Sequence, residues 1–362
     1  MNTAASTPRR AALVVGGTGI AGRALCRELT AQGWRTAGLS RSVSAPRDGV
    51  DALRADLTDA ESVREALAGL TPTHVFFTAW SRRPTEAENI TVNAAMVRNV
   101  LDAVGPSGHL RHVALVTGLK HYVGPFEAYG TGATRDTPFH EDEPRLDTPN
   151  FYYAQEDELW QAAERCRFTW SVHRSHTIIG HALGNAMNLG QTLAAQAALC
   201  RAEGLPFVFP GNEVQWHGIT DMTDAGLLAR QMIWAATAEN LPSQAYNTAN
   251  GDVFRWRWMW PRIAELLGVE PEGYAERPRP LEEQMAGKAE AWRRLAEREG
   301  LAEADLGRVA SWWHTDSDLN RPVECFTDMA RSRSAGFTDY ADTLASFTEL
   351  VATLREERVI PA

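Results

Sequence analysis

The pattern that most limits the fold lies near the start of the chain, where an apolar run leads into a glycine-rich turn. Residues 11–15 (Ala-Ala-Leu-Val-Val) are typical of a short buried strand, and the turn over 16–22 follows at once. Apolar residues then recur at helical spacing over 23–30. A strand, a glycine turn and a helix in this order form the context in which such a turn binds the phosphates of a dinucleotide. The pattern therefore predicts that the chain opens with a Rossmann-type α/β unit.

The three glycines of the turn have separate roles. Gly16 permits the tight turn, Gly19 lets the backbone approach a pyrophosphate, and Gly22 lets the helix pack against the strand. Their G-x-x-G-x-x-G spacing resembles that of the short-chain dehydrogenase/reductase superfamily, whereas many other dehydrogenases have G-x-G-x-x-G. The cofactor contacts expected in this turn are Gly16, Thr18, Gly19, Ile20 and Gly22. The alternative is a glycine turn with a purely structural role.

The end of the second expected strand, 36–39, bears on the choice of cofactor. An acidic residue there would accept hydrogen bonds from an adenosine ribose, but Arg41 and Ser42 stand at this point. The planar guanidinium of an arginine matches the geometry of a 2′-phosphate. We therefore expect Arg41 and Ser42 to contact NADPH, which carries that phosphate. The alternative is that Arg41 is a solvated loop charge.

The superfamily pattern implies further cofactor contacts. An aspartate at the place of Asp56, helped by the backbone of Leu57, hydrogen-bonds the adenine. The buried strand expected over 73–80 ends above the cofactor ribose, which brings in Ala79. Val116, near the end of the next strand, is expected to contact the cofactor as well.

That next strand, 112–117, leads into a loop that offers a lysine, a histidine and a tyrosine in succession. Lys120, His121 and Tyr122 follow Gly118. Because ligands sit at the carboxyl ends of strands in an open α/β sheet, a cation here is a candidate for chemistry. An ordinary surface lysine is the alternative.

Two strings of residues identify a family. Lys-His-Tyr-Val-Gly-Pro-Phe-Glu over 120–127 and Asn-Phe-Tyr-Tyr over 150–153 resemble the progesterone 5β-reductase/iridoid synthase-like family of atypical short-chain dehydrogenases/reductases. The likeness continues over 170–174, 247–254 and 312–313, and so covers nearly the whole chain. The resemblance implies an NADPH-dependent enone reductase in which Lys120 and Tyr152 are catalytic and also contact the cofactor.

The residues themselves show why such a chain is atypical. Ordinary short-chain dehydrogenases carry Tyr-x-x-x-Lys on one helix, which places both side chains on the same face. Here Glu156 stands four residues after Tyr152, and Asp157 stands four residues after Tyr153. Lys120 must therefore supply the cation from a separate segment.

The expected chemistry follows from charge. Hydride addition to the β-carbon of an enone leaves negative charge on the carbonyl oxygen, which Tyr152 can hydrogen-bond or protonate. Lys120 would favour the tyrosinate form and hold the nicotinamide ribose. Tyr153 is expected to be a packing residue, and His121 a scaffold for the loop.

The segment after the next strand departs from the family. Where the family reads Arg-Pro-Gly-Asn-Ile, this chain has Ser175, His176 and Thr177 between the arginine and the isoleucine. The remaining expected cofactor contacts are Ile178, Asn185, Ala186 and Met187. The expected substrate-pocket residues are Trp80, Phe126 and His176, with a purely structural histidine as the alternative for His176.

Composition sets the remaining limits. The chain has 362 residues, 44% of them hydrophobic, which suffices for a full core. The net charge of −10 argues against nucleic acid and against an anionic membrane surface as partners. The four cysteines show no metal-ligand spacing, so we expect no metal site and a reducing, cytoplasmic location. No apolar run is long enough to span a membrane.

The fold class expected is α/β, a Rossmann-type doubly wound parallel sheet with a smaller, mostly helical C-terminal substrate-binding lobe. Residues 1–10 are expected to form a flexible tail, and 11–187, with returns at about 214–254, the NADP-binding domain. Residues 188–213 and 255–362 are expected to form the substrate-binding lobe. The expected partner is a small unsaturated carbonyl compound; the oligomeric state is left open, with a homodimer as one possibility.

The predicted function is NADPH-dependent reduction of an α,β-unsaturated ketone or aldehyde by 1,4-hydride addition. Direct 1,2-reduction of a carbonyl is an alternative, because the same tyrosine and lysine can protonate an alkoxide. A non-catalytic NADP-sensing regulator is a third, although a sensor would need neither Lys120 nor Tyr152.

Overall fold

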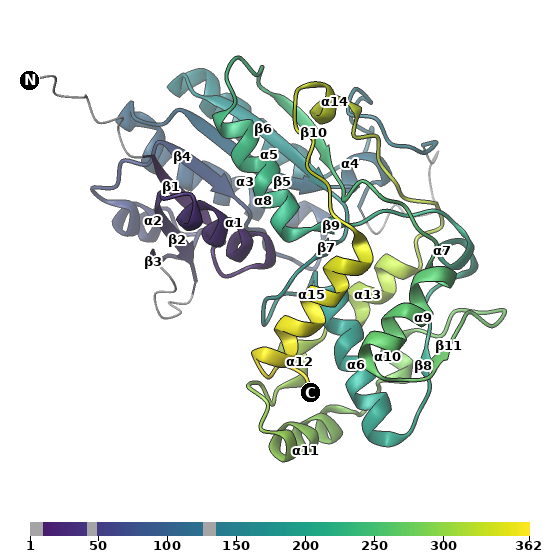
Figure 1. The fold of residues 1–362 in the computed structure, drawn as a ribbon. Helices are drawn as coiled ribbons and strands as arrows, with labels where there is room; N and C mark the ends of the chain where they lie inside the picture. Colours follow the sequence, from purple (N-terminus) through teal and green to yellow (C-terminus); the bar gives the residue numbers. More distant parts are fainter. Residues whose placement is uncertain (1–9, 42–48, 126–134) are drawn as a thin grey trace, which may run out of the picture.

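A parallel sheet is the largest element of the computed structural model, which describes residues 10–41, 49–125 and 135–362 (Figure 1). In this part of the chain seven strands pair in the order β3-β2-β1-β4-β5-β6-β10. They are β1 (Ala11–Val15), β2 (Arg35–Ser40), β3 (Val50–Arg54), β4 (His74–Phe77), β5 (His112–Gly118), β6 (Thr169–Ser175) and β10 (Gln244–Thr248). Because the order reverses between β1 and β4, the carboxyl ends of these two strands flank the place where such sheets bind ligands.

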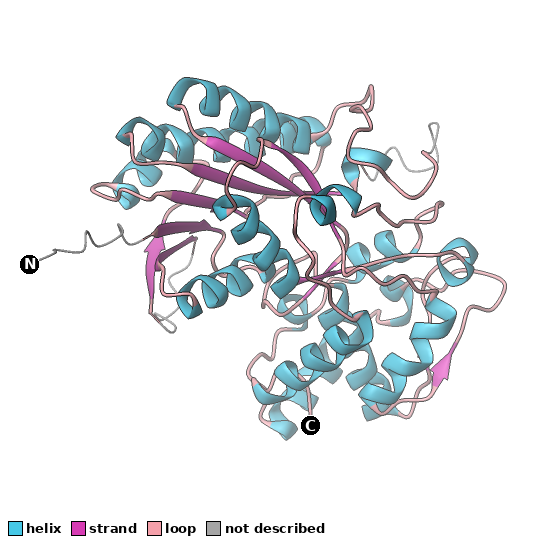
Figure 2. Ribbon diagram, turned by 45° about the horizontal axis from the view of Figure 1, so that its top comes forward, coloured by secondary structure: helices cyan, strands magenta, loops and turns pink. Residues whose placement is uncertain are grey.

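Helices cover both faces of the sheet (Figure 2). One face carries α1 (Ile20–Ala31) and α8 (Ala225–Thr237), and the other carries α2 (Ala60–Leu67), α3 (Glu86–Val104) and α5 (Phe151–Cys166). Strand β1 is apolar throughout because alternate residues enter different cores. Leu13 and Val15 pack under α2, α3 and α5, whereas Val14 packs under α1 and α8. This arrangement confirms the predicted doubly wound α/β fold.

A group of further helices lies together beside the sheet (Figure 1). They are α6 (Leu189–Glu203), α7 (Glu213–His217), α9 (Trp256–Leu267), α10 (Leu281–Gln284), α11 (Ala289–Glu299), α12 (Leu306–Val309), α13 (Trp312–Leu319) and α15 (Thr343–Glu356). Their shared core is built around three tryptophans, Trp256, Trp260 and Trp292, each at most 1% exposed. A short parallel pair, β8 (Phe207–Val208) and β11 (Pro271–Glu272), lies within this group.

The chain passes between the sheet and the helical group more than once. After α6 it returns through β9 (Thr223–Asp224), which pairs with β7 (Ile178–Ile179), and then forms α8 and β10. Near the C-terminus α14 (Ala330–Ser334) lies against β10. The limits expected for the two domains stay a prediction, taken up under the proposed function.

An ion pair ties the glycine-turn helix to the last helix of the chain. The guanidinium of Arg23 in α1 lies 2.7 Å from the carboxylate of Glu357, which directly follows α15. The other carboxylate oxygen of Glu357 lies 3.0 Å from His181 Nε2. The end of the sheet that carries the glycine turn and the end of the helical group are therefore held together directly.

Two further observations concern only the part of the chain that the structure describes. No helix there combines the length and apolar character that crossing a bilayer requires. No group of three or more histidine, cysteine, aspartate or glutamate side chains there is arranged to hold a metal ion.

Candidate active site

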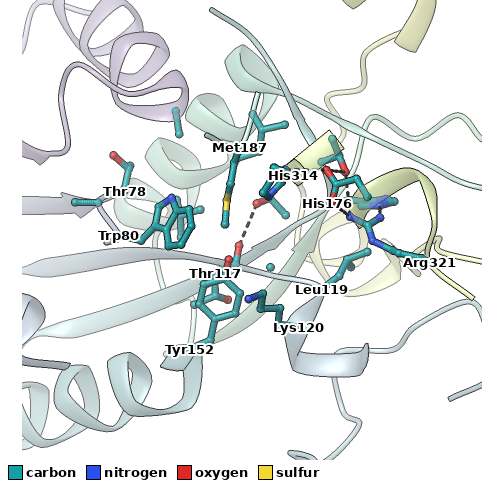
Figure 3. Close-up of a pocket in the computed structure, with 18 residues that line it drawn as sticks. Thr78, Trp80, Thr117, Leu119, Lys120, Tyr152, His176, Met187, His314 and Arg321 are labelled. Carbon is teal, nitrogen blue, oxygen red and sulfur yellow. Dashed lines mark hydrogen bonds and ion pairs between the residues drawn. The ribbon is translucent and has the colours of Figure 1, made fainter. Parts of the chain in front are cut away.

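A cavity lies at the carboxyl ends of β4, β5 and β6, between the sheet and α13 (Figure 3). Its lining comes from Ala21 of α1, residues 78–80 after β4, residues 116–120 at the end of β5, Tyr152 of α5, residues 175–178 after β6, Met187, and His314, Asp318 and Arg321. Most of the residues expected at the nicotinamide and at the substrate are thus brought to one place.

The two strings that identify the family meet through one asparagine. Lys120 begins α4 (Lys120–Val123), the short helix after β5, and Asn150 caps the start of α5. The Asn150 side-chain oxygen accepts a hydrogen bond from the Tyr152 backbone N–H at 3.0 Å. The Asn150 amide nitrogen donates to the Lys120 carbonyl at 2.7 Å. The start of one helix is thereby fixed against the start of the other.

Lys120 and Tyr152 face the same cavity (Figure 3). The Lys120 side chain is buried, with its ammonium 5.1 Å from the ring centre of Phe151. Tyr152 is half-buried, and its hydroxyl would lie 3.4 Å from a Cβ placed on Gly118. That Cβ would also lie 2.9 Å from the Ser175 carbonyl oxygen, so the close approach of β5 to the end of β6 needs glycine here. A phenol and an ammonium at one strand end suit proton donation to a developing oxyanion.

The position that would hold lysine on the same helix as Tyr152 is used for structure. Glu156 is 1% exposed and pairs with Arg145, with 2.8 Å between nitrogen and oxygen. Asp157 pairs with the same guanidinium at 2.7 Å. An acidic residue at this place therefore anchors the loop before α5.

Tyr153 and His121 have structural partners, as expected for packing and scaffold residues. The Tyr153 hydroxyl donates to the His121 carbonyl at 2.8 Å and accepts from the Leu146 N–H at 2.9 Å. His121 Nε2 donates to the Glu143 carbonyl at 3.1 Å. Burial lowers the pKa of His121 to about 3, so this imidazole is neutral. Neither residue is among those lining the cavity.

The glycine turn leaves the start of α1 open to an anion. Gly16 has a φ of +89°, and a Cβ on Gly22 would lie 2.1 Å from the Gly16 carbonyl oxygen. Gly19 caps α1 without a side-chain hydrogen bond, and the first turn holds no acidic residue. A side-chain Cβ at Gly19 would lie 3.7 Å from the Asn185 amide, so the expected contact Asn185 does adjoin this turn. Backbone amides at an uncapped helix start fit a pyrophosphate.

Two residues expected at the adenosine, Arg41 and Asp56, stand just after β2 and β3. Asp56 Oδ1 accepts hydrogen bonds from the Thr58 N–H at 2.9 Å and from the Thr58 hydroxyl at 2.7 Å. These bonds lower the pKa of Asp56, with smaller effects of the same sign from the charges of Arg41 and Arg83. Arg41 is exposed and near enough to Asp56 for its charge to act there. Arg83 is a second cation at this edge that sequence reasoning missed.

Other expected residues fall in different places. Trp80 lines the cavity and stacks on Phe151, with 6.0 Å between ring centres and 18° between planes. Ala79, Val116, Ile178 and Met187 also line the cavity. Ser42 and Phe126, expected at the 2′-phosphate and at the substrate, lie outside the described residues. Figure 3 shows Trp80 on the side opposite His176 and Arg321.

His176 both lines the cavity and belongs to a buried hydrogen-bonded network. Arg321 can only donate, so His176 Nε2, at 2.6 Å from its guanidinium, is the acceptor. The other ring nitrogen, Nδ1, then carries the proton and donates to Asp221 at 2.6 Å. Burial lowers the pKa of His176, which agrees with a neutral ring. The remaining oxygen of Asp221 accepts from the Thr327 N–H and hydroxyl, both at 2.8 Å.

The same network continues onto α13. Arg321 also forms an ion pair with Asp318. Asp318 Oδ2 lies 3.5 Å from Nδ1 of His314 and 3.5 Å from the Thr177 hydroxyl. We call His176, Thr177, His314, Asp318 and Arg321 the polar wall of the cavity.

Sequence reasoning missed the part of the polar wall that comes from α13. His314 and Asp318 stand four residues apart, on one face of α13, and Arg321 follows three residues later, just beyond the end of the helix. This spacing can be seen in the sequence just after the Trp312-Trp313 pair, but a polar helical face usually indicates a face exposed to solvent.

Comparisons with known proteins identify the family. A family model described as "PRISE-like Rossmann-fold domain" matches residues 47–318. The "3-oxo-Delta(4,5)-steroid 5-beta-reductase" of Arabidopsis thaliana is 38% identical over 363 residues, which cover 97% of this chain and 93% of that protein. The chain belongs to the PRISE-like family. A second relative, the "(S)-8-oxocitronellyl enol synthase CYC2" of Camptotheca acuminata, is 37% identical over 367 residues with the same coverage.

The PRISE-like chain is an oxidoreductase, as predicted. Among solved structures, the UDP-glucose 4-epimerase of Thermus thermophilus, in complex with NAD, superposes with a TM-score of 0.67. The match covers 95% of this chain and 99% of the epimerase at 18% sequence identity. At that identity the likeness establishes the fold alone, a Rossmann-type α/β fold.

The Asn150 contact generates a test in this PRISE-like enzyme. Asn150→Ala removes both the cap of α5 and the hydrogen bond to the Lys120 carbonyl. Asp342→Ala is the control, because it removes only the cap of α15, in which the Asp342 carboxylate accepts from the Ala345 N–H at 2.7 Å. Each change should lower the free energy of unfolding by about 1–2 kcal/mol in urea titrations. Only Asn150→Ala should also lower turnover per folded molecule, by about tenfold or more, because Lys120 shifts relative to Tyr152. Equal turnover in the two variants would contradict the positioning role.

Proposed function

We propose that this chain is an NADPH-dependent reductase of α,β-unsaturated carbonyl compounds, acting by 1,4-hydride addition. The observation that carries the proposal is the meeting of Lys120 and Tyr152, from two separate segments, on one cavity beside the glycine turn. The name of the Arabidopsis thaliana relative, a 3-oxo-Delta(4,5)-steroid 5-beta-reductase, describes reduction of a conjugated ketone and supports the proposal.

The cofactor, when bound, supplies a hydride to the β-carbon of the substrate. The protein holds the carbonyl oxygen of the substrate and stabilises the negative charge that develops on it. The Tyr152 hydroxyl donates a hydrogen bond to that oxygen as enolate character develops, or transfers its proton there. The nearby positive charge of Lys120 stabilises the negative charge that then resides on the enolate or the phenolate. Trp80 and Met187 add apolar surface to the lining of the cavity.

The division of labour between the two parts of the chain follows from where these groups lie. We propose that residues 11–187, with the return at about 214–254, bind the cofactor, and that 188–213 and 255–362 shape the substrate end. The glycine turn, the strand ends and Tyr152 belong to the first part, and α13 belongs to the second. The four cysteines are free thiols, which suits the reducing cytoplasm that we propose as the location.

For the cofactor we propose NADPH over NADH, on the grounds of Arg41. The exposed guanidinium stands at the end of β2, and both Arg41 and Arg83 lie near enough to Asp56 to affect it electrostatically. Two cations at the adenosine edge favour the additional negative charge of a 2′-phosphate.

Arg41→Ala should erase most of the preference for NADPH. The loss of a charge-assisted hydrogen bond costs on the order of 1.5–3 kcal/mol, or about ten- to a hundredfold in the ratio of the two dissociation constants. Arg35→Ala is the matched control, since Arg35 is also exposed but lies at the other end of β2. Fluorescence titration with both cofactors measures the ratio. Equal affinities of the unmodified protein for NADPH and NADH would contradict the proposal for NADPH.

The adjacent tyrosines offer a matched pair for the chemistry. Tyr152→Phe keeps the ring and removes the hydroxyl from the cavity, so turnover with an enone should fall about 10²-fold or more with cofactor affinity little changed. Tyr153→Phe instead unpairs the buried His121 carbonyl and the Leu146 N–H, and should lower stability by about 1–3 kcal/mol while turnover per folded molecule is kept. Steady-state NADPH oxidation and urea unfolding measure the two effects. The reverse pattern would show that Tyr153 is the catalytic tyrosine.

A further inference from the structure

The polar wall is an unusual boundary for a cavity that takes an unsaturated carbonyl compound. His314 and Asp318 are each 4% exposed, Arg321 is 7% exposed and His176 is 3% exposed. The ionised side chains among them, Asp318 and Arg321, have lost much of their hydration, and a hydrocarbon packed against them would remove the rest without supplying new hydrogen bonds. A ligand that fills the cavity therefore favours a polar group at this wall.

The charges of the wall limit what that polar group can be. Arg321 is already engaged by Asp318 and by His176. Asp221 adds a second negative charge behind His176. Burial lowers the pKa of both His176 and His314, so neither imidazole balances that charge near neutral pH. An anionic group is disfavoured here, because it would be repelled by the Asp318 carboxylate. The guanidinium of Arg321 already pairs with Asp318 and His176.

The geometry around Asp318 suits a group that both donates and accepts. Its Oδ2 lies 3.5 Å from His314 Nδ1 and 3.5 Å from the Thr177 hydroxyl, the outer limit for direct hydrogen bonds. A hydroxyl oxygen beside them can donate to the carboxylate and accept from the imidazole or the threonine. A carbonyl oxygen can only accept, so it could not donate to Oδ2, whose contacts with His314 and Thr177 are both as long as 3.5 Å.

The polar wall also lies at the end of the cavity away from Lys120 and Tyr152, where a remote group of the substrate would reach. Lys120 and Tyr152 come from the strand and helix ends of the sheet, whereas His314, Asp318 and Arg321 come from α13 and its end, on the far side (Figure 3). Lys120, Tyr152, His314 and Asp318 all line the same cavity, so both ends belong to it.

We propose that the substrate carries a hydroxyl group at the end remote from its conjugated carbonyl, and that Asp318 of the polar wall accepts its hydrogen bond. This inference rests on the proposed function for the position of the carbonyl at Tyr152. It makes the polar wall the determinant of specificity and places the substrate among hydroxylated enals or enones.

The test uses linear 2-enals of several chain lengths, each ending in a methyl, a hydroxyl or a carboxylate group. Binding to the NADP⁺-bound protein is measured by calorimetry, and kcat/KM by NADPH oxidation with product identification. At the best-fitting length the hydroxyl compound should bind about ten- to a hundredfold tighter than the methyl compound, and the carboxylate compound should not exceed it. Equal or stronger binding of the methyl or the carboxylate compound would overturn the inference.

Variants locate the preference on the wall. Asp318→Asn and His314→Phe should each bring the hydroxyl-to-methyl ratio close to one, whereas Ser317→Ala should keep it. Ser317 is on the same helix, and its hydroxyl donates to the Trp313 carbonyl. An unchanged ratio in the wall variants, or a matching loss of NADP⁺ affinity, would overturn the inference. If a wall variant fails to fold, the three end groups still decide it in the unmodified protein.

The same data separate the inference from the proposed function. Preferential binding of the hydroxyl compound with no reduction of its double bond would overturn the proposed function and leave the hydroxyl site standing. Reduction of all three compounds without preference would overturn the hydroxyl-site inference and leave the proposed function standing.

Discussion

The hydrogen bond from Asn150 to the Lys120 carbonyl is the contact on which the site depends. In an ordinary short-chain dehydrogenase one helix fixes the distance between tyrosine and lysine, because the two stand four residues apart. In this chain they stand on different segments, so a tertiary contact must do the same work. Asn150 does so twice over, since it caps α5 just before Tyr152 and holds the carbonyl of Lys120 at 2.7 Å. The Tyr153 hydroxyl adds a second tie through the His121 carbonyl.

Behind this contact the sheet supplies a rigid support. The Tyr122 hydroxyl, next to the Lys120 segment, donates to Asn247 of β10 at 2.6 Å and accepts from Arg174 of β6 at 3.2 Å. Tyr122 also stacks on Phe139, with 4.9 Å between ring centres. Burial raises the pKa of Tyr122 to about 12, so its hydroxyl stays protonated as a donor. The family strings at 120–127, 150–153, 170–174 and 247–254 therefore include neighbours that hold one another in place.

Much of the fold, and part of the lining of the candidate site, could be predicted from the sequence because the signals are local. The strand, turn and helix around Gly16 to Gly22 have a fixed order, and the Lys120 and Tyr152 strings have distinctive neighbours. The polar wall could not be predicted in the same way. The contact of His176 with Asp221 spans 45 residues, and that with Arg321 spans 145. Whether the polar face of α13 meets solvent or a cavity depends on how the helical group docks on the sheet, which no local pattern encodes.

The central claim is that hydride reaches the β-carbon while Tyr152 holds the carbonyl oxygen. For 1,4-addition the β-carbon must lie about 3–3.5 Å from the hydride, whereas for 1,2-addition the carbonyl carbon takes that place. The most direct measurement is reduction of an enone with NADPH that carries deuterium on the transferred position of C4, followed by NMR of the product. The account predicts deuterium at the β-carbon of a saturated ketone. Deuterium on a carbinol carbon, with the double bond intact, would contradict it and establish carbonyl reduction instead.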